Sequence, residues 1–138
     1  MSIVKIVLDT NCLLESISRN SVNKIILDKL ISGDYDLYLT NEILMEYEEK
    51  IADIFSSETA ELIISFLSVL ENVKKIDIHY HLNLITTDPD DNKFVDCAFA
   101  SNVHYLVTND KHYNKLKSVT FPIINIISLV EFKNLLDS

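Results

Sequence analysis

The sequence predicts an α/β protein, a three-layer α/β/α sandwich whose central parallel sheet has four to five strands. Two observations carry this prediction. Short apolar segments of strand length alternate along the chain with segments whose apolar residues have helical spacing, which is typical of strand–helix–strand units. The first such segment, residues 3–8 (IVKIVL), is almost uniformly apolar and β-branched, which indicates a strand buried on both faces of a sheet.

The first strand is expected to end at Asp9, where the polar tripeptide DTN begins. The next helix is expected to begin at Ser21, because serine is a good N-cap, and to stop at Gly33. A short second strand follows at residues 37–39 (LYL). The apolar positions of the helix are Val22, Ile25, Ile26 and Leu30.

Two helices are expected after the second strand. The first is capped by Thr40 or Asn41, and the second is capped by Ser56 or Ser57. The apolar stripe of the first consists of Ile43, Leu44, Tyr47, Ile51 and Ile54, and that of the second consists of Leu62, Ile63, Phe66, Leu67 and Leu70.

The second half of the chain continues the alternation. The loop 86–92 (TTDPDDN) starts a helix, residues 111–117 form one or two helical turns, and Ser128 caps a last helix. The remaining strands are expected at residues 73–78, 105–107 and 123–126.

Composition limits the classes of function. The chain of 138 residues suits a single domain, residues 1–138, and its 48% hydrophobic content suits a packed core. One glycine excludes a glycine-rich phosphate loop, and Cys12 and Cys97 are too few for a disulfide framework or a cysteine zinc site. No targeting or membrane-spanning segment is visible, so we expect a cytoplasmic protein. The net charge of −9 would repel nucleic acid unless bound cations or a basic partner intervene.

Acidic residues fall where the predicted strands end. Asp9 and Asp110 follow strands, Asp91 opens a helix, and Glu42 and Glu46 share one face of another helix. Taken singly, each of these acids is more often a turn former or a helix cap. Together they lie at the carboxyl edge of the sheet, where ligands bind in such folds. Grouped carboxylates repel one another unless they hold cations, and Mg²⁺ and Mn²⁺ prefer such oxygen ligands. The pattern therefore favours metal-assisted phosphodiester hydrolysis.

Four blocks of this sequence resemble the PIN domain, most closely its bacterial and archaeal branch of toxin components of toxin–antitoxin pairs. The blocks are VLDTN at 7–11, EILMEYEEKI at 42–51, DPDDNKFVDCAFA at 88–100 and YLVTNDKHY at 105–113. The resemblance covers about residues 3–136. It implies an α/β/α sandwich and an endoribonuclease that uses Mg²⁺ or Mn²⁺ on single-stranded or structured RNA. It also implies a cognate antitoxin protein and a homodimer. The apolar stretches are too short to span a bilayer, so no membrane association is expected.

The resemblance also implies roles for particular residues. The catalytic, metal-binding acids would be Asp9, Glu46 in preference to Glu42, Asp91 and Asp110. Asn11 and Thr108 match polar positions that support these acids. Asp88 is an extra acid outside the family pattern and is a candidate to hold the loop or a second ion. Lys93, Lys111 and Lys115 lie near the same edge and are candidates for contact with RNA phosphates, although solvated lysines are commoner.

Two other classes of function, a phosphatase or phosphoacceptor domain and a silent binding module, fit parts of the pattern. An aspartyl-nucleophile phosphatase would need an acid two residues after Asp9, where Asn11 stands, and a phosphoacceptor domain would need a lysine after the last strand. A catalytically silent binding module with the same fold is the third hypothesis, and the complete set of four acids argues against it. His79 and His81 share a strand face, but with no third ligand in sight an ordinary strand surface is the more frequent case.

Overall fold

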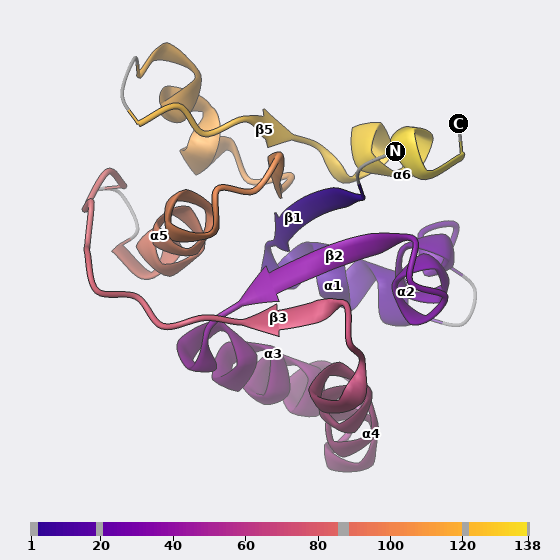
Figure 1. Ribbon diagram of the computed structural model, residues 1–138. Coiled ribbons are helices and arrows are strands. Elements are labelled where there is room, and N and C mark those ends of the chain that lie inside the picture. The colour runs from indigo at the N-terminus through magenta and orange to yellow at the C-terminus, as the bar shows by residue number, and fades with distance from the viewer. Residues whose placement is uncertain (1–2, 19–20, 86–88, 120–121, 138) are drawn as a thin grey trace.

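The computed structural model describes residues 3–18, 21–85, 89–119 and 122–137. Its centre is a five-stranded sheet in the order β3-β2-β1-β4-β5 (Figure 1). Every pairing between neighbouring strands is parallel, which confirms the predicted sheet. The strands are β1 (Val4–Leu8), β2 (Tyr35–Leu39), β3 (Val73–Lys75), β4 (Tyr105–Val107) and β5 (Ile126–Ile127).

The middle strand, β1, is buried on both faces, as its uniformly apolar sequence predicts. Ile6, Val7 and Leu8 are fully buried, because β1 pairs with β2 on one side and with β4 on the other and is covered from above and below. Helix α5 (Asn92–Ser101) packs on β1, β2 and β4, and Figure 1 shows α1 (Thr10–Ile17) behind the sheet. The three-layer α/β/α arrangement is therefore confirmed.

The remaining helical elements connect the strands. None of the helices in the described part of the chain is long and apolar enough to cross a membrane. These elements are α2 (Lys24–Ile31), α3 (Asn41–Ile54), α4 (Ser57–Val69) and α6 (Leu129–Asp137), with 3-10 helices η1 (Pro89–Asp91) and η2 (Lys111–Ser118).

Side-chain caps fix where several helices begin. The Thr40 hydroxyl accepts a hydrogen bond from Ile43 N at 3.1 Å, and the Ser56 hydroxyl accepts one from Thr59 N at 3.0 Å. Ser128 and Glu131 cap α6 reciprocally, a capping box in which each side chain accepts from the other's backbone N–H. The structure thus selects Thr40 and Ser56 among the predicted alternatives and confirms Ser128.

Three boundaries differ from the sequence prediction. Residues 10–17 form α1 directly after β1, where only a strand end was expected. The helix expected from Ser21 begins at Lys24, because the Ser21 hydroxyl accepts from Asn23 N within a turn and does not cap the helix. The last strand lies at 126–127 and not at 123–126, since only Ile126 and Ile127 pair with β4.

The third strand is also shorter than predicted and ends at Lys75 instead of residue 78. Beyond Lys75 the chain leaves the sheet and crosses to α5. There its backbone bonds to α5 side chains: Leu82 N donates to Asp96 Oδ1 at 3.0 Å, and Ile85 N donates to Asn92 Oδ1 at 2.8 Å. The last backbone bond to β2 is from Ile76 N to Leu39 O at 2.9 Å, and the later bonds fix the following segment on α5.

Helices α3 and α4 form a hairpin that extends away from β1 (Figure 1). Because α4 packs mainly on α3, part of the predicted apolar stripe faces outward. Ile54, Leu62 and Phe66 of the predicted apolar stripes are 63%, 57% and 39% exposed.

Candidate functional site

The predicted acids from three distant segments meet at the carboxyl edge of the sheet. Asp9 directly follows β1, Asp110 lies three residues beyond the end of β4, and Asp91 ends η1 at the start of α5. The charges of Asp91 and Asp110 both act on the carboxylate of Asp9, which shows that the three lie close together. The predicted meeting of these acids is thus found in the structure.

The hydroxyl of Thr108 links two of these acids. It donates a hydrogen bond to Asp9 Oδ2 at 2.7 Å and accepts one from Asp110 N at 3.0 Å. Because Thr108 is itself buried, this hydroxyl fixes both the Asp9 carboxylate and the turn that carries Asp110. Thr108 therefore lies where a residue that supports the acids would be needed.

Asp9 is only 6% exposed, and its surroundings disfavour its charge. Burial raises the pKa of Asp9 from 3.8 to about 6, against the opposing effect of the Thr108 hydrogen bond. The negative charges of Asp91 and Asp110 raise it further. A carboxylate held in this way gains from a nearby cation, so the site favours the binding of positive charge.

A second group of ligand atoms comes from Asp91, Asp110 and His112. One ligand atom from each lies within 4.8 Å of the other two. His112 Nδ1 is 3.4 Å from Asp110 Oδ1 and 3.5 Å from Asp91 Oδ2. Two carboxylates and an imidazole are a donor set that suits a divalent transition-metal ion. His112 was not among the predicted site residues; its position two residues after Asp110 was the available signal.

Glu46, the fourth predicted acid, has other partners. Its Oε1 is 2.7 Å from Lys93 Nζ, and its Oε2 accepts a hydrogen bond from the Thr10 hydroxyl. The Lys93 and Glu46 side chains are only 10% and 22% exposed, so this ion pair is largely enclosed. Glu46 does not join the group of Asp91, Asp110 and His112. It is connected to Asp9 through the neighbouring Thr10.

The predicted role of Lys93 as a free phosphate contact is modified by this pairing. Burial lowers the pKa of Lys93, but the hydrogen bond to Glu46 and the charges of Glu46, Asp90 and Glu42 outweigh that effect and leave the pKa raised. Lys93 is therefore a firmly protonated cation inside the acidic edge.

The other predicted supporting residues have different outcomes. Asn11 is exposed and lines a cleft of about 430 Å³ together with Asp9, Asn109 and Asp110. Asp88 lies outside the described residues. Lys111 is exposed near the same edge.

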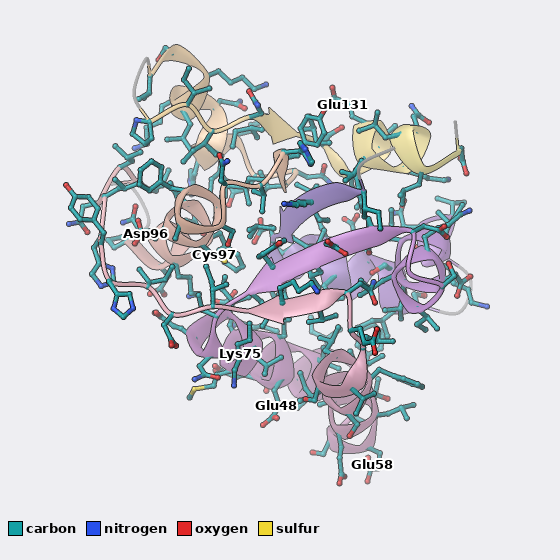
Figure 2. All side chains as sticks on the ribbon, viewed as in Figure 1. Glu48, Glu58, Lys75, Asp96, Cys97 and Glu131 are labelled. Atoms are coloured by element: carbon teal, nitrogen blue, oxygen red, sulfur yellow. The ribbon has the colours of Figure 1, made fainter. Side chains whose placement is uncertain are left out.

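The two cysteines are buried and inert. Cys12 lies beside the site in α1, and Figure 2 shows Cys97 on α5 next to Asp96. Burial raises the pKa of each thiol to about 12, so neither forms a thiolate at neutral pH. Both cysteines therefore act as small buried residues.

Comparisons with known proteins find a matching family model and several structures of similar fold. A family model for the PIN domain matches residues 5–112. No curated protein matches the chain. Among solved structures, VapBC2 from Rickettsia felis bound to a DNA fragment from its promoter is similar, with a TM-score of 0.60 at 16% identity over 91% of this chain and 98% of that chain. DNA-bound VapBC from Salmonella typhimurium has a TM-score of 0.57 at 15% identity over 92% and 99%. At such identities the likeness concerns the fold.

Proposed function

Because this chain belongs to the PIN domain family, we propose that it is a metal-dependent endoribonuclease that hydrolyses phosphodiester bonds in RNA. The proposal is carried by the convergence of Asp9, Asp91 and Asp110. Their negative charges repel one another, as the raised pKa of Asp9 indicates. Such a cluster is costly to a fold unless a cation uses it. Family membership supports the nuclease class, and the donor atoms support the metal.

The residues present fit a divalent cation. The closely spaced donor atoms of Asp91, Asp110 and His112, with the enclosed carboxylate of Asp9 next to them, offer oxygen and nitrogen ligands. We assign Asp9, Glu46, Asp91 and Asp110 as the acids that serve Mg²⁺ or Mn²⁺, with His112 as an added donor. When bound, the cation would neutralise the acids and polarise the scissile phosphate and the attacking water.

The protein's own groups orient this site. Thr108 fixes Asp9, and Lys93 with Thr10 fixes Glu46, so both carboxylates are held before any substrate arrives. Water is the proposed nucleophile, because the thiols of Cys12 and Cys97 are buried and protonated. Preorganised carboxylates of this kind lower the reorganisation needed during reaction.

We propose that the natural partner is an antitoxin protein that neutralises the acidic site, and that the chain forms a homodimer. Two observations support the antitoxin: the sequence resemblance to the toxin branch of the family, and the likeness in fold to the VapBC structures. A partner that supplied positive side chains would complement the net charge of −9.

Cleavage of a labelled single-stranded RNA in Mn²⁺ tests the proposal. The native protein should cleave, and cleavage should cease with a chelator or with Asp9→Asn. Asp53→Asn, which changes an exposed carboxylate on α3, is the matched control and should retain activity. Cleavage that survives both the chelator and Asp9→Asn would refute the assignment. A phosphate monoester should remain intact, which separates this function from that of a phosphatase.

A further inference from the structure

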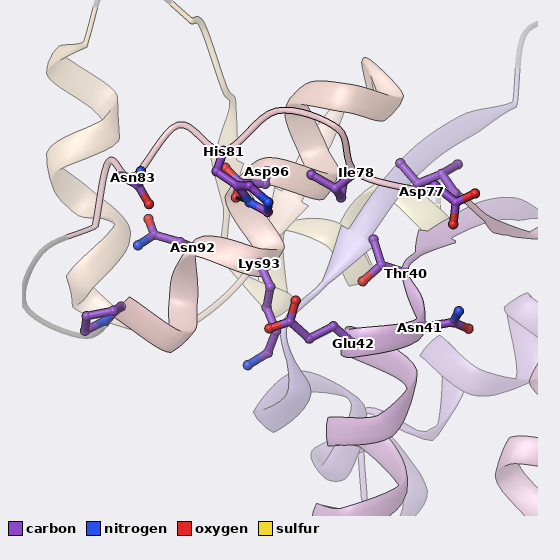
Figure 3. Close-up of a pocket in the computed structure, with 12 residues that line it drawn as sticks. Thr40, Asn41, Glu42, Asp77, Ile78, His81, Asn83, Asn92, Lys93 and Asp96 are labelled. Atoms are coloured by element: carbon purple, nitrogen blue, oxygen red, sulfur yellow. Dashed lines mark hydrogen bonds and ion pairs between the residues drawn. The ribbon is translucent and has the colours of Figure 1, made fainter.

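A second hollow lies on the same edge of the sheet, beside the acid site. It has a volume of about 380 Å³, within the range of small-ligand pockets, and lies between the start of α3, the segment after β3, and α5 (Figure 3). Its walls include Glu42, Asp77, Ile78, His81 and Lys93.

The wall formed by the segment after β3 is anchored to α5. Asp96, which is 4% exposed, accepts a hydrogen bond from Leu82 N at 3.0 Å and lies 3.2 Å from His81 Nδ1. Asn92 bonds both the N–H and the C=O of Ile85, at 2.8 and 2.9 Å. The pocket is therefore formed without a ligand, which lowers the cost of ordering on binding.

The polar groups of the pocket favour a neutral ligand that donates hydrogen bonds. Among the described residues, neither the Glu42 nor the Asp77 carboxylate accepts a hydrogen bond, although the charge of Glu42 acts on Lys93, which lines the same pocket. Both carboxylates can accept hydrogen bonds from amino groups, and the lining cation Lys93 is already paired with Glu46 at 2.7 Å. Ile76 and Ile78 add half-buried apolar surface, and the His81 ring is 67% exposed, which suits stacking against a flat ring.

The pocket and the acid site are neighbours along the edge. The strand order places the ends of β2 and β3, which lead into the pocket, beside the ends of β1 and β4, which lead into the acids. Lys93 belongs to both, because it lines the pocket and its Nζ is 2.7 Å from Glu46 of the acid site. A polynucleotide strand that lies along this edge would meet the pocket and the acids with adjacent nucleotides.

We propose that this pocket seats one unpaired base of the RNA substrate and selects bases that carry an exocyclic amine. Adenine, cytosine and guanine have such an amine, whereas uracil presents carbonyl oxygens at the corresponding positions. Asp and Glu side chains accept hydrogen bonds from amines of this kind, as they do from cytosine N4. The inference rests on the proposed ribonuclease function and adds a specificity site to it.

Binding of neutral nucleosides tests the pocket apart from catalysis. Adenosine, cytidine, guanosine and uridine are titrated into the protein in EDTA, and ¹H–¹⁵N NMR follows the side-chain amides of Asn41 and Asn83, which line the pocket. The three amine-bearing nucleosides should shift these signals and bind about 2- to 10-fold more tightly than uridine, the effect of one net hydrogen bond. Shifts confined to other surfaces, or equal binding of all four nucleosides, would overturn the proposal.

Two isosteric variants sharpen the test. Asp77→Asn and Glu42→Gln replace an acceptor with an amide that also donates to uracil oxygens, so the preference over uridine should fall below about 2-fold. Asp53→Asn is the control and should keep the preference. These positions are exposed, and an unchanged NMR spectrum outside the pocket verifies folding. Variants that keep the full preference would contradict the assignment.

A cleavage assay separates the two proposals. RNA oligonucleotides that differ in one base near the cut are incubated with the protein in Mn²⁺. Cleavage with a base preference that Asp77→Asn abolishes supports both proposals. Cleavage without any base preference refutes the role proposed for the pocket and still supports the ribonuclease function. No cleavage at all, with nucleosides still shifting the pocket, refutes the ribonuclease function and the substrate role given to the pocket.

Discussion

Replacing Asp9 with asparagine should make the metal-free protein more stable at neutral pH. Burial and the charges of neighbouring acids raise the pKa of Asp9 from 3.8 to about 6 in the folded protein. The gap between these two values corresponds to about 3 kcal/mol of unfolding free energy. Asparagine has no charge to bury, and its amide oxygen can still accept the hydrogen bond from Thr108.

The sign of the effect follows from proton binding. Between pH 3.8 and about pH 6 the folded protein keeps the Asp9 proton while the unfolded chain has lost it. Folded-state stability therefore falls as pH rises through this window. Below pH 3.8 both states are protonated and the penalty is absent; above about pH 6 it is fully present. The native protein should thus lose stability relative to Asp9→Asn across this window.

Urea denaturation in EDTA measures the effect. At pH 8 the Asp9→Asn variant should unfold with a free energy about 2–3 kcal/mol higher than the native protein, and at pH 3.5 the two should agree within about 0.5 kcal/mol. Asp53→Asn should differ little at either pH. A variant that is less stable than the native protein at pH 8, or that differs equally at both pH values, would show that the buried charge of Asp9 does not destabilise the fold.

Three further predictions concern the partners of the acids. Thr108→Val should lower the unfolding free energy by about 1–3 kcal/mol and raise the pKa of Asp9 above 6, because it removes the hydroxyl bonded to the carboxylate; an NMR titration with an unmoved pKa would contradict this. Lys93→Met should lower the unfolding free energy in a denaturation experiment by about 1–3 kcal/mol, because it leaves the Glu46 carboxylate without its cationic partner. Lys93→Arg should retain most of the stability. Equal losses in the two variants would argue against a stabilising ion pair. Mn²⁺ at 100 times its dissociation constant should stabilise the protein by about 2.7 kcal/mol, and Asp110→Asn should greatly reduce the thermal shift; a shift of the same size would place the ion elsewhere.

Much of the fold was predictable because it is encoded locally. The apolar run that forms β1, the capping residues Thr40 and Ser128, and the acids that follow strands each act within a few residues of their own position. Parallel strands then bring Asp9 and Asp110 to one edge by topology alone. The position of the acidic edge therefore follows from the order of strands and acids along the chain.

The remainder depends on contacts between distant segments. The pairing of Glu46 with Lys93 and the approach of His112 to Asp91 require α3, α5 and η2 to be placed in space. Helix α1 was not predicted, because its polar first residues, Thr10 and Asn11, are also typical of a turn. Part of the apolar stripe of α4 faces outward, because this helix packs mainly on α3 and only to a small extent on strand β3.

Anomalous diffraction from a crystal soaked in Mn²⁺ would show whether the acidic edge holds the ion. We expect a peak within coordination distance of Asp91 and Asp110, next to Asp9, and no such peak in Asp110→Asn. A protein that cleaves RNA in Mn²⁺ while its crystals show no peak among these side chains would not use this edge as its metal site.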